Sequence, residues 1–244
     1  MMTMRWSDVL AVFSWADAAA LAFLWLSYLA IGWRIEHPSK ARPSVSILMQ
    51  GFRREWMQQM VTRQPRIFDA HLLGTLRQGA SFFASASMIA IGGGLALIGN
   101  TDPLAGLAED LTLGDTPPLV WEIKILVIVL FQANAFLKYV WAHRLFGYCA
   151  VAMAAVPNDP EHGQAAPRAR QAAELNITAA RSFNRGMRAT YFALAVCAWL
   201  IGPAMLALAA LATVAMLWRR EFASHSRSVL LSSPPEPSGA GDGI

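Results

Sequence analysis

The stretch LVWEIKILVIVLFQANAFLKYVW, residues 119–141, decides the fold of this chain. Most of its residues are apolar, and tryptophans stand near its two ends. The 20 residues from Trp121 to Trp141 rise about 30 Å as an α-helix, which is the thickness of the hydrocarbon core of a bilayer. Because tryptophan concentrates at the membrane–water interfaces, the stretch predicts a membrane-spanning helix.

Three further apolar segments are long enough to span a bilayer, at 15–33, 80–99 and 189–218. Of all residues, 55% are hydrophobic and only 15% are charged, against roughly 25% charged in soluble domains. The sequence therefore predicts an all-α fold, a polytopic transmembrane helical bundle of about four spanning helices in one integral membrane domain, 1–231. Residues 232–244 are rich in Pro, Ser and Gly, which predicts a disordered tail.

The connections between these segments alternate in charge. Residues 34–79 carry eight Arg or Lys and three acids, 100–118 carry four acids and no base, and 142–188 are basic again. Short basic connections stay in the cytoplasm, so we expect 34–79 and 142–188 to be cytoplasmic and the N-terminus to lie outside a bacterial inner membrane. The first segment is followed by Trp33-Arg34 and not by a small-residue cleavage site, which predicts a retained helix instead of a signal peptide.

The end of the last apolar segment conflicts with this scheme. Four spans would bring the C-terminus outside, yet Arg219 and Arg220 directly follow the segment 189–218. Gly202-Pro203 interrupts that segment and leaves two halves that are each too short to cross alone. We expect one tilted helix that is kinked at Pro203. The alternative is a helical hairpin that keeps the tail in the cytoplasm.

Residues 45–61 have the period of an amphipathic helix. Apolar residues recur at the spacing i, i+3, i+4, i+7, and Arg53 and Arg54 fall on the other side. The helix either lies on the membrane surface with its arginines toward anionic lipid, or packs on cytoplasmic extensions of the spanning helices. Because helical pattern continues beyond the spans, we expect a small helical bundle on the cytoplasmic side.

Polar residues within the third span are candidates for function. Gln132, Asn134 and Lys138 lie in this span together with Glu122 and Lys124 near its start, and such residues usually face the interior of a bundle or a wet cavity. Gln132 and Asn134 fit hydrogen bonds between helices, and Lys138 can extend toward the interface. The alternative is that these residues line a path for a solute or an ion.

No complete catalytic, cofactor or metal motif stands in the sequence. The five histidines form no i, i+4 pair, so we expect no metal and no cofactor. The net charge of +4 comes without a nucleic-acid-binding signature, so we expect no nucleic-acid partner. Ala86, Ala90 and Gly94 form a small-xxx-small face on which another helix, including that of a second copy, can approach.

Several short motifs carry a resemblance to a known family: REWM at 54–57, RIFD at 66–69, LL at 72–73 and SFFAS at 81–85. With them the chain resembles a family of bacterial and plant multi-pass membrane proteins that is known only as a domain of unknown function. The resemblance covers about residues 10–220 and implies an integral membrane protein of roughly four helices, with no activity to carry over. The positions that it marks as candidates are Arg54, Trp56, Arg66, Asp69, Ser81, Phe83 and Ser85.

These observations favour a non-enzymatic accessory or scaffold protein. We expect it to lie in the lipid bilayer and to bind a protein partner or anionic lipid through its basic cytoplasmic side. The alternative function is a small solute or ion transporter or channel that uses the polar residues of the third span.

Overall fold

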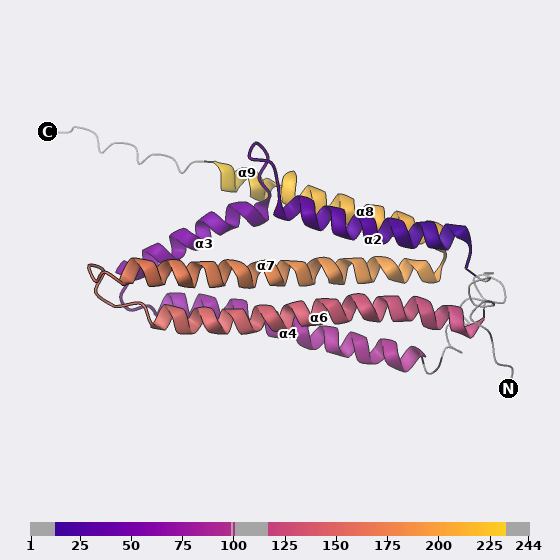
Figure 1. Ribbon diagram of the computed structural model, residues 1–244, viewed down its shortest axis with the longest axis horizontal. Coiled ribbons are helices and arrows are strands. Elements are labelled where there is room, and N and C mark those ends of the chain that lie inside the picture. The colour runs from indigo at the N-terminus through magenta and orange to yellow at the C-terminus, as the bar shows by residue number, and fades with distance from the viewer. Residues whose placement is uncertain (1–12, 99, 101–116, 233–244) are drawn as a thin grey trace.

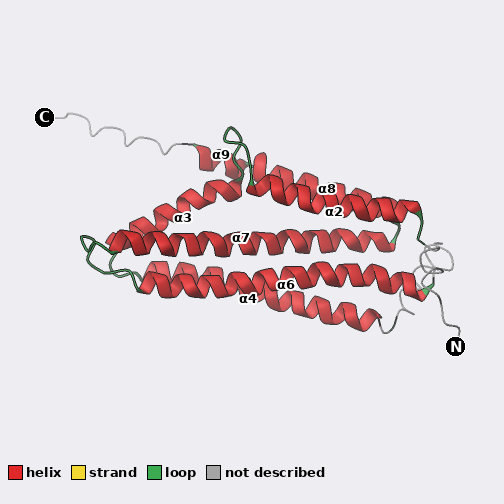
Figure 2. Cartoon of the chain, viewed as in Figure 1, coloured by secondary structure: helices red, strands yellow, loops and turns green. Residues whose placement is uncertain are grey.

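The computed structural model describes residues 13–98, 100 and 117–232, and these residues form helices and connections with no strand (Figure 2). The predicted all-α class is thereby confirmed. The predicted acidic connection and C-terminal tail lie almost wholly outside the described residues. The helices are α2 (Trp15–Glu36), α3 (Val45–Thr62), α4 (Ile67–Ile98), α6 (Pro118–Ala154), α7 (Ala165–Cys197), α8 (Pro203–Phe222) and α9 (His225–Leu231), with a 3-10 turn at Ala198–Leu200.

The helix ends follow from local sequence. Ser14 caps α2 in a capping box with Asp17, and the Ser44 side chain caps α3, so that backbone N–H groups of each first turn find an acceptor. Pro118 and Pro203 begin α6 and α8, where a missing N–H costs nothing.

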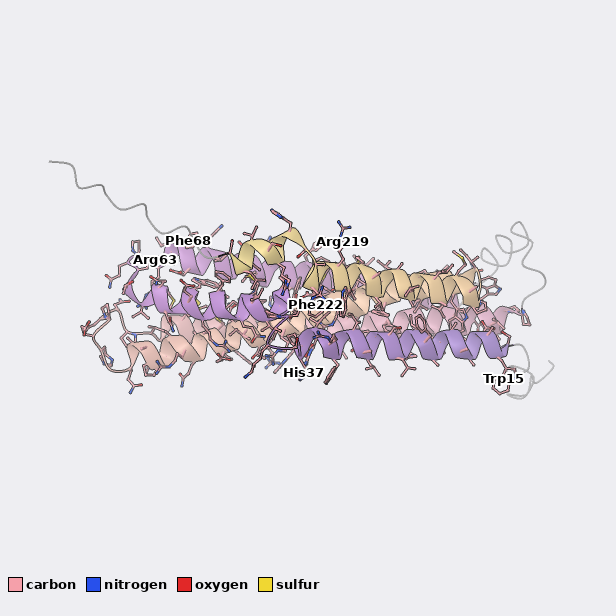
Figure 3. The ribbon with its side chains drawn as sticks, turned by 90° about the horizontal axis from the view of Figure 1, so that it is seen from above. Trp15, His37, Arg63, Phe68, Arg219 and Phe222 are labelled. Atoms are coloured by element: carbon pink, nitrogen blue, oxygen red, sulfur yellow. The ribbon has the colours of Figure 1, made fainter. Side chains whose placement is uncertain are left out.

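The bundle has two halves, which we name by their surfaces. The helices α4, α6 and α7 run along most of the length of the molecule, whereas α2 and α8 cover only one half of α7 (Figure 1). Seen from above, Trp15 lies at one end, Arg63 and Phe68 lie near the other, and His37 and Phe222 lie near the middle (Figure 3). The apolar half consists of α2, α8 and residues 80–98, 118–141 and 186–197, and the polar half of α3 and residues 67–79 and 142–185.

The apolar half has the dimensions of a bilayer. Within the described part of the chain, four stretches are long and apolar enough to span a membrane, namely α2, α4, α6 and residues Pro203–Leu231. The 22 residues of α2 and the 20 residues of α8 give lengths of about 33 and 30 Å. Large apolar side chains on this half point outward, among them Leu26, Phe82, Ile89, Leu130 and Leu208.

The prediction of a single kinked helix over 189–218 is wrong. The helix α7 ends at Cys197, the chain reverses through the 3-10 turn and Gly202, and α8 then runs back along α2 (Figure 1). Gly202 has a φ of 157°, a backbone angle that residues other than glycine rarely adopt. Pro203 cannot continue the preceding helix. The chain therefore forms the alternative hairpin, in which the end of α7 and the whole of α8 each pass through the apolar half in opposite directions.

The hairpin places the last part of α7 at the centre of the apolar half. There Phe192 and Trp199 are buried together with Leu24 of α2, Phe131 of α6 and Leu206 of α8. The C-terminal part of α3 packs on the rest of the polar half through Met57, Met60 and Val61, which join a cluster of buried residues from α4, α6 and α7. The N-terminal part of α3 diverges from α7 (Figure 1). Of the two alternatives for this amphipathic helix, packing on the bundle is therefore the one observed for its C-terminal part.

Candidate functional site

A cluster of ion pairs lies where the two halves meet. The carboxylate of Glu36, the last residue of α2, pairs with both Arg185 and Arg188 of α7. Arg185 Nε donates to Glu36 Oε1 over 2.9 Å, and this hydrogen bond raises the pKa of Arg185. Arg188 is buried, so the carboxylate of Glu36 compensates a cation that is largely withdrawn from water. The cluster fixes the end of α2 against α7.

A second carboxylate at the same level joins α8 to α3. Glu221 is buried near the end of α8 and accepts hydrogen bonds from the backbone N–H of Ser46 over 3.0 Å and from its hydroxyl over 3.1 Å. An anion at the first turn of α3 is favoured by the helix dipole. Both carboxylates of this region are therefore already engaged.

A cavity of about 230 Å³ lies between α3, α7 and the end of α8, and we call it the arginine pocket. Its polar lining includes Gln50 and Asn184. Its charged lining consists of four arginines and two glutamates: Arg53, Arg181, Arg188, Arg220, Glu36 and Glu221. Positive charge therefore exceeds negative charge around the cavity.

Three of these arginines have no carboxylate partner among the described residues. Arg53 donates to the amide oxygen of Asn176, and Arg220 Nη1 donates to the hydroxyl of Tyr191 over 3.0 Å. Burial lowers the pKa of Arg53, which reflects the cost of holding a cation away from water. Arg181 is exposed at the rim of the cavity. Guanidinium groups in this arrangement suit a phosphate or a carboxylate.

The arginine pocket lies at the boundary of the apolar half. Glu36 and Glu221 line it from the last turns of α2 and α8, about 30 Å from the other ends of these helices. A group bound there would be level with the headgroups of a bilayer that surrounds the apolar half.

The structure brings two of the three polar candidates of the third span together. Asn134 Nδ2 donates to the hydroxyl of Tyr28 over 3.0 Å, and Lys138 Nζ donates to Asn134 and lies 3.4 Å from the same hydroxyl. These contacts join α6 to α2. Gln132 stands apart, with a buried amide oxygen that has no partner within the described part of the chain. A solute path through these residues stays a prediction.

Three residues of the family motifs hold the polar half together. The indole N–H of Trp56 donates to Asp69 over 2.7 Å, and Arg63 pairs with the same buried carboxylate. Arg66 donates to the backbone oxygens of Val156 over 2.7 Å and Pro157 over 2.8 Å. These contacts fasten the α3–α4 turn to the α6–α7 connection, so they have a structural role.

The other motif residues lie farther apart. Arg54 forms an exposed ion pair with Glu174, with 2.7 Å between Nε and Oε1. Ser81 and Ser85 are exposed on α4. Phe83 packs on Tyr139 and Phe183 at ring-centroid distances of 5.5 and 5.6 Å.

The small residues Ala86, Ala90 and Gly94 of α4 do not all contact the same neighbour. A Cβ atom on Gly94 would lie 2.6 Å from a methyl group of Val129, so this glycine allows α4 to approach α6 closely. Ala86 and Ala90 instead lie on the exposed side of α4. Approach of a second copy on that side stays a prediction.

The sequence placed Arg53 on the polar side of its helix, but it did not predict that the residues of the arginine pocket form one site, although weak signals exist. Arg181 and Arg188 are seven residues apart, which places them on one face of a helix, and Arg220 follows the last apolar run. Glu36 and Glu221 are single acids next to apolar segments. Only the hairpin of α7 and α8 brings all of them to one cavity.

The fold defines this protein as a polytopic helical membrane protein. Over residues 19–226 it matches the family described as a protein of unknown function, DUF599, and the chain belongs to that family. No curated protein and no solved structure matches it. Among the described residues, no group of His, Cys, Asp and Glu side chains could hold a metal ion.

Proposed function

We propose that this protein is a non-enzymatic accessory or scaffold protein of the membrane that binds the anionic headgroup of a lipid in the arginine pocket. One observation carries the proposal: the cavity has four arginines around it, and its two glutamates are already engaged. A phosphate group there can accept charge-assisted hydrogen bonds from several guanidinium groups. It would also offset the positive charge of the half-buried Arg53.

We further propose that the polar half faces the cytoplasm of a bacterium and that Trp15 lies at the outer face of its inner membrane. The course of α8 supports this topology, because it puts Arg219 and Arg220 on the same side as the basic connections. The cytoplasmic leaflet is also rich in anionic lipid. A reporter that is active only in the cytoplasm tests the topology. We expect this reporter to be active when it is fused after Ser232 and when it is inserted at Gly163. Inactivity at both positions would contradict the proposed topology.

Lipid retention tests the arginine pocket. The full chain is purified in detergent that contains equal amounts of phosphatidylglycerol and phosphatidylcholine, and native mass spectrometry records the lipids that stay bound. We expect wild type to retain phosphatidylglycerol preferentially. In the double variant Arg53→Gln/Arg181→Gln, one of the bound phosphatidylglycerol molecules should be held at least about tenfold more weakly than in wild type, because charge-assisted hydrogen bonds to its headgroup are lost.

Two controls make the result specific. Arg219→Gln removes one charge from the same end of α8, but Arg219 is outside the pocket lining, so its lipid retention should equal that of wild type. Glycerol phosphate is added as a soluble competitor, and displacement of the lipid by it at low concentration would point to a soluble anion as the ligand. Equal retention by the double variant and wild type would overturn the proposal.

A further inference from the structure

A second cavity opens on the side of the bundle, between α2 and α6. Its volume is about 590 Å³, and Arg185 and Arg188 of α7 contribute to its lining. Its remaining wall changes in character along its length, from Trp25, Leu29 and Leu130 to Asn134 and Lys138. We call this cavity the lateral groove. It is separate from the arginine pocket, and the ion pair between Glu36 and Arg188 lines both.

We infer that the lateral groove binds one anionic glycerophospholipid from the surrounding membrane, with its phosphate at Lys138 and Arg185 and an acyl chain along Leu29 and Leu130. This site rests on contacts of its own and does not require that the arginine pocket binds lipid.

The polar part of the groove has an excess of positive charge. Among the described residues, the hydrogen-bond partners of Lys138 are Asn134 and Tyr28, and no carboxylate pairs with it. Arg185 and Arg188 share the single carboxylate of Glu36. A phosphate group would supply the negative charge that these cations lack, and it could accept hydrogen bonds from both Lys138 and Arg185.

The apolar part of the groove fits a hydrocarbon chain. Trp25 stacks on Phe131 with 4.7 Å between ring centroids, which forms a firm aromatic wall. Leu29 and Leu130 are 60% and 53% exposed, so apolar surface is open beside that wall. A free phosphate or a sugar phosphate would leave this surface uncovered, whereas an acyl chain would cover it.

The level of the groove along the bundle selects a lipid over a soluble ligand. Lys138 is 20 residues after Pro118, or about 30 Å along α6, which places it at the interface when the apolar half fills the hydrocarbon core. Leu130 is eight residues nearer to Pro118 and therefore about 12 Å deeper. A phospholipid has the same order of parts, with its phosphate at the interface and its chains inside.

Photolabelling can test this site separately. The full-length protein is placed in nanodiscs of phosphatidylcholine that contain a small fraction of phosphatidylglycerol with a diazirine in its acyl chain, and labelled positions are mapped by mass spectrometry. We expect saturable labelling near Leu29 and Leu130. Labelling of Ile89, on the exposed face of α4, should rise with probe concentration without saturation.

Two variants and two controls decide the outcome. Lys138→Met should lower the labelling at Leu29 and Leu130 about tenfold, as expected for a lost charge-assisted hydrogen bond, and leave that of Ile89 unchanged. Leu29→Trp, which fills the groove and keeps its charge, should lower labelling at Leu130. Arg219→Gln and the pocket variant Arg181→Gln should label as wild type does.

Three results would overturn the inference. They are unchanged labelling at Leu130 in both Lys138→Met and Leu29→Trp, an equal loss at Ile89, and complete competition by glycerol phosphate at the concentration at which phosphatidylglycerol competes. Suppose that Lys138→Met loses labelling while Arg53→Gln/Arg181→Gln retains as many phosphatidylglycerol molecules as wild type in native mass spectrometry. This outcome would support the lateral groove as a lipid site and count against the arginine pocket. The two sites thus fail independently.

Discussion

The helix α4 is highly apolar but mostly exposed, whereas α7 is more polar but lies between other helices. In the most apolar 18-residue window of α4, only 11% of the residues are buried. The helix α7 has several arginines, yet it contacts α2, α3, α6 and α8 and its inner face consists largely of alanine. The most apolar helix therefore lies at the edge, and a more polar one lies at the centre.

This difference shows what drives packing in each part of the molecule. Apolar side chains gain nothing by leaving a lipid environment, so helices in a membrane associate through small residues and through polar contacts. Gly186 of α7 illustrates the point, since a Cβ atom there would lie 2.7 Å from the ring of Tyr139. Four predictions probe the contrast between these helices and between the two halves.

The largest effect is expected for a lysine on the exposed face of α4. Ile89 is 76% exposed and lies nine residues, about 14 Å, before the end of α4, near the middle of the apolar half. A lysine at the centre of a spanning helix costs about 2.5–3.5 kcal/mol of insertion free energy, so Ile89→Lys should lower the fraction inserted in a membrane-insertion assay.

The matched control for this change lies in the polar half. Val151 is 72% exposed on α6, and Val151→Lys should change stability by less than about 0.5 kcal/mol, because the proposed topology places the polar half in water. Equal loss of insertion in the two variants would mean that the boundary between the halves is misplaced.

The next largest effect concerns the buried carboxylate of the polar half. Asp69→Ala leaves the indole N–H of Trp56 without its acceptor and Arg63 without its partner. We expect a loss of about 2–3 kcal/mol in the free energy of unfolding, less than for a fully buried ion pair because Arg63 is partly exposed. Thermal unfolding in detergent measures it. Asp69→Asn keeps one acceptor oxygen, so its melting temperature should lie between those of wild type and Asp69→Ala. A wild-type melting temperature for Asp69→Ala would contradict the structural role of Asp69.

A glycine pair compares the centre with the edge. Gly186→Ala forces a methyl group against Tyr139 and should destabilise the fold by about 1–3 kcal/mol. A Cβ atom on Gly92 of α4 would meet nothing within 4 Å, so Gly92→Ala should be neutral or stabilising by up to about 1 kcal/mol. Unfolding in a denaturant series gives the free energy of unfolding of each variant. Equal changes of the same sign in the two variants would contradict the view that α7 is tightly packed at the centre and α4 is open at the edge.

The smallest effect is expected at the surface of the polar half. The ion pair of Arg54 with Glu174 is about half exposed on both sides. Arg54→Ala should therefore cost about 0.2–1 kcal/mol, and the loss should shrink at high salt. A double-mutant cycle with Glu174→Ala isolates the pair. A coupling energy as large as the loss of about 2–3 kcal/mol expected for Asp69→Ala would show that burial does not distinguish the two ion pairs.

Three of the predicted spans could be recognised from the chain alone because a bilayer demands about 20 apolar residues in a row. The segments 15–33, 80–99 and 119–141 lie within the longer helices α2, α4 and α6, apart from residue 99, which lies outside the described residues. The fourth segment could not be resolved, since the last part of α7 and α8 up to Trp218 form one apolar run, and only the reversal at Gly202 separates them. Asn134 and Lys138 were recognisable because polar side chains in a span are rare.

The sequence by itself determined the helical class, the membrane environment, the alternation of charge and the family to which its motifs belong, because all of these depend on composition and spacing along the chain. Only the tertiary structure decided that α7 lies inside and α4 outside, and that arginines from α3, α7 and α8 meet around one cavity. The physical reason is that hydropathy reports whether a segment tolerates lipid. Which segments touch one another depends instead on the shape of small residues and on hydrogen bonds between residues far apart in the chain.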